Sequence, residues 1–145
     1  MTPGFSHLIA QLTGNLPFPW QRKLYEPSVG QVEVGIPLSC NIPTGLGKTS
    51  VVAVWLLALA AKPELVPRRL VCVANRRTVV DQTTDEVRRY IKALDENQDL
   101  QLVRASLLNL WAIPISLNPM QASPLEVSTL RGQCRTHAVS VSTLS

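Results

Sequence analysis

The hydrophobic pattern divides the chain into short strands and helices that follow one another. Alternation of apolar residues predicts a strand at Ile36–Ile42, and a continuous apolar run predicts a buried central strand at Leu70–Ala74. Segment Thr49–Ala61 is apolar almost all round, which is typical of a helix buried on most sides. Apolar residues three and four positions apart predict a helix from Thr78 to about Leu94, opened by a capping box at Thr78. Strands that alternate with helices favour an α/β fold with a doubly wound parallel sheet.

Weaker patterns predict the other elements. They are helices at about Phe5–Leu12, Trp20–Tyr25 and Leu102–Ala112, and a strand at Pro124–Leu130. Beyond Gln133 the sequence is rich in serine and threonine and shows little pattern. We therefore expect one partial domain at residues 1–133, incomplete at its C-terminus, and an unpatterned tail at residues 134–145.

The clearest motif lies between the first predicted strand and the helix after it. It reads Pro43-Thr44-Gly45-Leu46-Gly47-Lys48-Thr49. The two glycines let successive backbone N–H groups face one anion, and the helix adds its positive N-terminal end. Lys48 is expected to reach the β- and γ-phosphates as the catalytic lysine, and Thr49 to bind Mg²⁺. All seven residues are predicted to bind a nucleotide. The alternative is a glycine turn with a solvated lysine.

A departure from the general phosphate-loop pattern narrows the class. In G-x-x-x-x-G-K-[ST] the first glycine would stand at position 42, where this chain has Ile42. The variant resembles motif I of the superfamily 2 helicases. Gln21, which follows Phe18-Pro19-Trp20, resembles the Q motif of that superfamily, whose amide pairs with adenine. The resemblance implies ATP with Mg²⁺ and a RecA-like domain. The alternative for Gln21 is a surface position on a helix, and Phe5, a candidate aromatic partner, fits the core better.

Two further runs follow predicted strands. Arg76 and Arg77 come after the second strand and resemble motif Ia, which contacts the backbone of a nucleic-acid strand. Thr129, Arg131 and Gly132 resemble the next strand-contacting loop. We therefore predict single-stranded DNA as a partner. Ordinary solvated arginines and a plain strand-exit turn are the alternatives.

Composition adds limits. The formal net charge of +4 is compatible with a nucleic-acid partner but is weak evidence for one. No basic segment followed by an apolar core opens the chain, and no apolar run approaches the roughly 20 residues that span a bilayer. The three cysteines, Cys40, Cys72 and Cys134, form no C-x-x-C pair and are interpreted as reduced core residues. A cytoplasmic protein without a membrane partner is expected.

Taken in order, four runs resemble the helicase part of the CRISPR-associated helicase-nuclease, most closely the type I-U (I-G) form. They are Phe18–Gln21, Pro43–Thr49, Arg76–Gln82 and Ser128–Gln133, and the resemblance covers residues from about 4 to 133. It implies an enzyme that a crRNA-guided surveillance complex recruits and that unwinds and degrades target DNA. It also implies ATP and Mg²⁺ for translocation, and metal ions at a separate nuclease site.

An ATPase of this class also needs an apolar strand that ends in Asp-Glu. The two pairs in this chain, Asp85-Glu86 and Asp95-Glu96, fall on the predicted helix after Thr78 and do not follow a strand. A second RecA-like domain and a His-Asp nuclease cluster are not recognised either. The expectation is an ATP-binding fragment with negligible hydrolysis of its own. The alternatives are a non-enzymatic ATP- or nucleic-acid-binding remnant, or a P-loop NTPase that does not act on nucleic acid.

Overall fold

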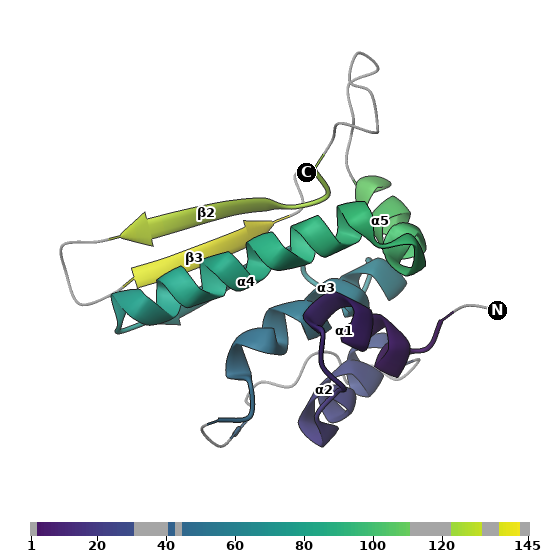
Figure 1. Cartoon of the computed structure of the whole chain (residues 1–145), viewed down its shortest axis with the longest axis horizontal. Coiled ribbons are helices and arrows are strands. Elements are labelled where there is room, and N and C mark those ends of the chain that lie inside the picture. Colours follow the sequence, from purple (N-terminus) through teal and green to yellow (C-terminus); the bar gives the residue numbers. More distant parts are fainter. Residues whose placement is uncertain (1–2, 31–40, 43–44, 111–122, 132–136, 143–145) are drawn as a thin grey trace, which may run out of the picture.

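The computed structural model describes residues 3–30, 41–42, 45–110, 123–131 and 137–142 (Figure 1). The helices are α1 (Phe5–Thr13), α2 (Pro19–Val29), α3 (Val51–Ala61), α4 (Arg77–Glu96) and α5 (Gln101–Leu108), with 3₁₀ turns η1 (Lys48–Ser50) and η2 (Gln98–Leu100). The strands are β1 (Arg69–Ala74), β2 (Glu126–Arg131) and β3 (His137–Ser142).

Helix α4 lies between the sheet and the other helices (Figure 1). It contacts all three strands on one side and helices α1, α3 and α5 on the other, and α2 packs on α3. Its apolar face explains this position, because Val80, Val87 and Leu94 are buried while Asp85, Arg88 and Lys92 are exposed. The predicted amphipathic helix is confirmed.

Helix α3 forms the centre of the hydrophobic core. Every residue from Val52 to Leu59 is buried, as its nearly uniform apolar sequence predicts. Trp55 is largely buried, and its indole N–H donates to the carbonyl of Pro67 at 2.8 Å, which ties the end of the core to the segment before β1. This packing fixes α3 and therefore the loop that precedes it.

The sheet differs from the predicted parallel arrangement. The described strands have the order β1-β3-β2, and both neighbouring pairs are antiparallel, so β1 and β2 run parallel with β3 between them. Residues 36–40 of the first predicted strand lie outside the described residues, and Asn41 and Ile42 are not in a strand. A mixed α/β fold is present, but the doubly wound sheet is not seen among the described strands.

The segment expected to be unpatterned contains the middle strand of this sheet. In β3, Val139 and Val141 alternate with serines, but six residues of this composition give too weak a pattern for a sequence prediction. Strand β1, predicted as a central buried strand, lies at one side of the described sheet. Its outer face leaves Val71 51% and Val73 64% exposed. The expectation of a fully buried β1 was therefore wrong.

Helix boundaries also moved. Helix α2 continues past Tyr25 through Pro27 to Val29. Helix α4 begins at Arg77 with Arg76 as its N-cap, which makes no side-chain capping bond, so the predicted capping box at Thr78 is wrong. Thr78 instead lies inside the first turn. In contrast, Gly14 ends α1 in the left-handed conformation (φ 76°), as predicted.

Candidate functional site

The glycine loop has the backbone conformation that its sequence predicts. Gly45 (φ 85°) and Gly47 (φ 63°) both lie in the left-handed region, which residues with a Cβ rarely adopt. The 3₁₀ turn η1 starts at Lys48 directly after Gly47 and leads into α3. Pro43 and Thr44 lie outside the described residues. The loop therefore reverses direction at two glycines and enters a helix, as a phosphate-binding loop does.

Lys48 and Thr49 occupy the first positions of this helical segment. Lys48 is exposed and Thr49 is half-buried, so both side chains are accessible from the loop. A lysine and a hydroxyl next to the free N–H groups of a helix start match what a triphosphate and its Mg²⁺ need. These residues are the ones in the chain that fit such a ligand.

Helix α2 holds the loop in place through its first turn. The indole N–H of Trp20 donates to the carbonyl of Leu46 at 2.9 Å, and Nε2 of Gln21 donates to Oγ of Ser50 at 2.6 Å. The Phe18 ring lies 3.4 Å from the position that a Cβ on Gly47 would take. Three consecutive contacts therefore join α2 to the loop.

Gln21 has a structural place that its sequence did not reveal. It is only 3% exposed, so the surface-helix alternative is wrong. Its Oε1 accepts a hydrogen bond from the backbone N–H of Phe18 at 2.8 Å, while its Nε2 binds Ser50, whose hydroxyl in turn donates to the carbonyl of Gly47. The amide thus links the start of α2 to the loop. Its predicted contact with adenine stays a prediction.

Sequence reasoning missed Ser50 and the role of Trp20. The only available signal was that both stand next to recognised motifs, and the loop partners are 26 and 29 positions from Trp20 and Gln21. Phe5 stacks on Tyr25 with ring centroids 4.3 Å apart, and both pack against the core. The core interpretation of Phe5 is confirmed.

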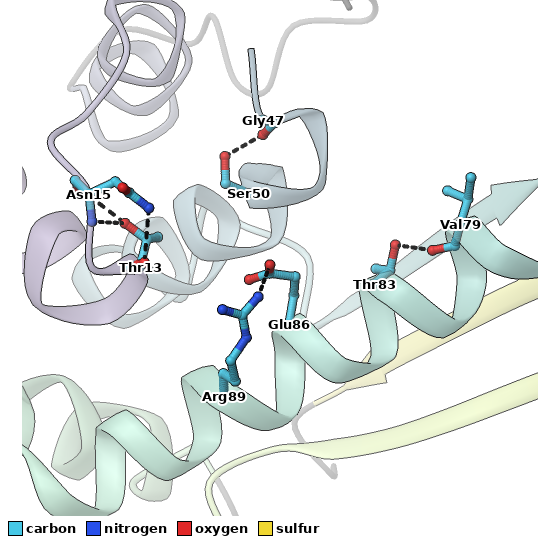
Figure 2. Close-up of polar contacts among 8 residues, drawn as sticks. All are labelled: Thr13, Asn15, Gly47, Ser50, Val79, Thr83, Glu86 and Arg89. Carbon is cyan, nitrogen blue, oxygen red and sulfur yellow. Dashed lines mark hydrogen bonds and ion pairs between the residues drawn. The ribbon is translucent and has the colours of Figure 1, made fainter. Parts of the chain in front are cut away.

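A polar cavity of about 140 Å³ adjoins the loop. Its lining includes Gly47, Thr49 and Ser50 on the loop side and residues of α4 on the other. Figure 2 shows Glu86 and Arg89 projecting from α4 toward the space between the loop and the Thr13–Asn15 turn.

Glu86 organises the α4 side of this cavity. Its carboxylate accepts a hydrogen bond from Arg89 and is only 28% exposed. Burial, and then the charge and hydrogen bond of Glu86, raise the pKa of the Tyr90 phenol well above its usual range. The turn that faces Glu86 is fixed by Asn15, whose backbone N–H donates to Oγ1 of Thr13 at 3.2 Å (Figure 2). Both walls of the cavity are therefore held by internal hydrogen bonds.

A second cavity, of about 160 Å³, lies on the other side of the loop. It joins Lys48 and Thr49 to the end of β1 and the start of α4, including Cys72, Ala74 and Val79. Its walls are mostly apolar. Burial raises the pKa of the Cys72 thiol, which therefore stays protonated near neutral pH.

The predicted nucleic-acid residues separate into two groups. Arg76 and Arg77 are exposed at the end of β1, and Ala74 and Arg131 both pair with His137, so β1 and β2 end at the same edge of the sheet. Thr129 is half-buried, and its hydroxyl shares a hydrogen bond with that of Thr84 on α4 at 3.1 Å. Thr129 therefore packs between sheet and helix, and Gly132 lies outside the described residues.

The two Asp-Glu pairs lie on α4, as expected. Asp85 pairs with Arg88 on the exposed side, and Asp95 accepts from Arg104 at 2.9 Å. Within the described ranges, no group of three or more His, Cys, Asp or Glu side chains could hold a metal ion. In the same part of the chain, no helix is long and apolar enough to cross a membrane.

Comparison with known proteins gives one match. The family model described as "Type III restriction enzyme, res subunit" matches residues 20–108, more than half of the chain. That range contains Trp20, Gln21, the glycine loop and both arginines at the end of β1. No curated protein and no solved structure matches. The match supports the DExD/H helicase superfamily and an ATP-dependent, helicase-like function at the level of the family, without identifying a CRISPR-associated form. The chain belongs to the family of type III restriction enzyme res subunits.

Proposed function

We propose that this chain binds ATP with Mg²⁺ at Gly45–Thr49 and forms the ATP-binding part of a helicase that acts on DNA. The observation that carries the proposal is the loop itself, with two glycines at positive φ directly before Lys48. The family match supports the nucleotide class.

Each loop residue has a distinct role in this proposal. Backbone N–H groups from Gly45 to Thr49 face the phosphates, and the Lys48 ammonium neutralises the β- and γ-phosphate charge. The Thr49 hydroxyl is the ligand for Mg²⁺, which would shield the remaining phosphate charge. The contacts of Trp20 and Gln21 keep the loop in this form before the ligand arrives, which lowers the entropic cost of binding.

The DNA contact is assigned to the end of β1. Arg76 and Arg77 are exposed there, beside the cavity that Lys48 also borders. Two guanidinium groups at the start of a helix favour phosphates of a passing single strand. This placement supports communication between bound DNA and bound nucleotide.

Binding without appreciable hydrolysis is the expected behaviour. Both Asp-Glu pairs lie on α4, where neither follows a strand as the metal-binding acidic motif of this class does. Phosphate release in the presence of single-stranded DNA should therefore stay near the background. A fast DNA-stimulated rate that Lys48→Ala abolishes would contradict this part of the proposal.

Calorimetric titration with Mg-ATP tests the binding proposal. Lys48→Ala should weaken binding at least about tenfold, because it removes a charge-assisted contact to the phosphates. Lys62→Ala is the matched control, since Lys62 stands at the opposite end of α3 and should leave affinity unchanged. Equal affinities for the unmodified protein and Lys48→Ala would refute the site.

The finer proposal is a RecA-like, doubly wound domain of a CRISPR-associated helicase-nuclease. It rests on the four sequence runs named above. Its test is capture of the chain by a purified crRNA-guided surveillance complex loaded with target DNA, with the same complex lacking target as the control. Retention that does not depend on target DNA would argue against it.

A further inference from the structure

Two cavities border the phosphate loop, and they differ in chemistry. The cavity toward β1 is lined mainly by apolar side chains such as Val51, Val73 and Val79. The cavity toward α4 presents Gln21, Ser50, Glu86 and Arg89. A nucleoside carries hydroxyl, amino and ring-nitrogen groups that lose hydrogen bonds to water when it binds, so it favours the polar cavity.

Within that cavity, the Gln21 side chain already has partners at both ends. Its Oε1 and Nε2 are engaged by Phe18 and Ser50, and the residue is 3% exposed. Glu86 has more capacity. A carboxylate has about four acceptor positions, and the contacts with Arg89 and Tyr90 use only part of them.

A second pair on the same helix shows that the direction of Glu86 is specific. Asp85 and Arg88 have the same i,i+3 spacing, but their side chains are 72% and 70% exposed. Glu86 is 28% exposed and lines the cavity together with Thr49 and Ser50. One acid–arginine pair therefore faces solvent, and the other faces the place where a loop-bound nucleotide would extend.

We infer that Glu86, supported by Arg89, is a specificity residue that accepts hydrogen bonds from the ribose hydroxyls or base amino group of a nucleoside triphosphate. The inference rests on the proposed phosphate site, because it places the nucleoside of the same ligand. It assigns to α4 a role in ligand selection that the loop motif alone does not contain.

The test compares Mg-ATP with Mg-tripolyphosphate, which has the phosphates and no nucleoside. Calorimetry is run on the full chain, on Glu86→Gln and on the control Asp85→Asn. Glu86→Gln keeps the shape and removes the charge. It should weaken ATP binding about tenfold, leave tripolyphosphate binding within about twofold, and leave Asp85→Asn unchanged for both ligands. Arg89→Gln, whose exposed site tolerates substitution, should show a smaller selective loss for ATP.

The outcomes are separable. If neither ATP nor tripolyphosphate binds the unmodified protein, the phosphate site and this inference both fail. If both ligands bind and Glu86→Gln weakens them equally, Glu86 acts on the phosphate or metal end and the inference alone is overturned. An unchanged ATP affinity in Glu86→Gln, with thermal unfolding like that of the unmodified protein, also overturns it. Titration with 2′-deoxyATP and GTP then shows whether Glu86 contacts the sugar or the base.

Discussion

Replacing Gln21 by alanine should loosen the phosphate loop and destabilise the fold. The change removes two hydrogen bonds, one from the Phe18 backbone N–H and one to the Ser50 hydroxyl, at a side chain that is almost fully buried. A hydrogen bond contributes about 1 kcal/mol net, and a buried group left without a partner costs about 1–3 kcal/mol. The free energy of unfolding should therefore fall by about 2–3 kcal/mol, a large share of the 5–15 kcal/mol of typical domains.

Urea unfolding followed by tryptophan fluorescence measures this loss. Gln101→Ala is the matched control, because Gln101 also makes two hydrogen bonds near the start of a helix, to the carbonyls of Leu94 and Asn97, but is exposed. Water replaces those bonds, so its cost should stay below about 1 kcal/mol. Equal effects of the two substitutions would refute the argument from burial.

Ligand binding by the same variant separates two roles for Gln21. If the residue holds the loop, Gln21→Ala should weaken Mg-ATP and Mg-tripolyphosphate by similar factors. If its amide reads adenine, only ATP should be affected. The internal bonds of Gln21 favour the first result, and a loss confined to ATP would contradict it.

Two more predictions concern the DNA edge and the buried phenol. Arg76→Ala with Arg77→Ala should lower the salt slope of single-strand binding by about 1.4, at about 0.7 per phosphate contact, while Arg88→Ala with Lys92→Ala leaves it unchanged; equal slopes would remove the DNA edge from this site. The raised pKa of Tyr90 means that the folded state holds the phenol proton more tightly than the unfolded chain. This stabilisation is present below the ordinary pKa of 10.0 and is lost as pH rises above it. Urea midpoints should therefore fall less steeply above pH 10 in Tyr90→Phe, and identical slopes would contradict the assignment.

Features set by neighbours in the sequence were predictable. The period of α4, the left-handed end of α1 at Gly14 and the positive φ of Gly45 and Gly47 all follow from local residue types. The phosphate loop belongs to this group because its glycines and its helix are consecutive. These parts of the account needed no knowledge of tertiary contacts.

Features set by distant partners were not predictable. Strand β3 pairs with both other strands, yet its six residues carry only a weak alternation between serine and valine. Strand β1 has the apolar composition of a central strand, but its neighbours leave Val73 exposed. The contacts of Trp20 with Leu46 and of Glu86 with the loop-side cavity depend on how α2 and α4 pack, which no short motif encodes.

The central claim is that the backbone of Gly45–Thr49 binds phosphate. Amide resonances of ¹⁵N-labelled protein, followed during titration with Mg-ATP, test it most directly, since hydrogen bonds to phosphate move the N–H signals concerned. The account predicts that the largest saturable shifts occur at Gly45, Gly47, Lys48 and Thr49, and that Lys48→Ala reduces them. Saturable shifts concentrated elsewhere, with these four amides unmoved, would contradict it.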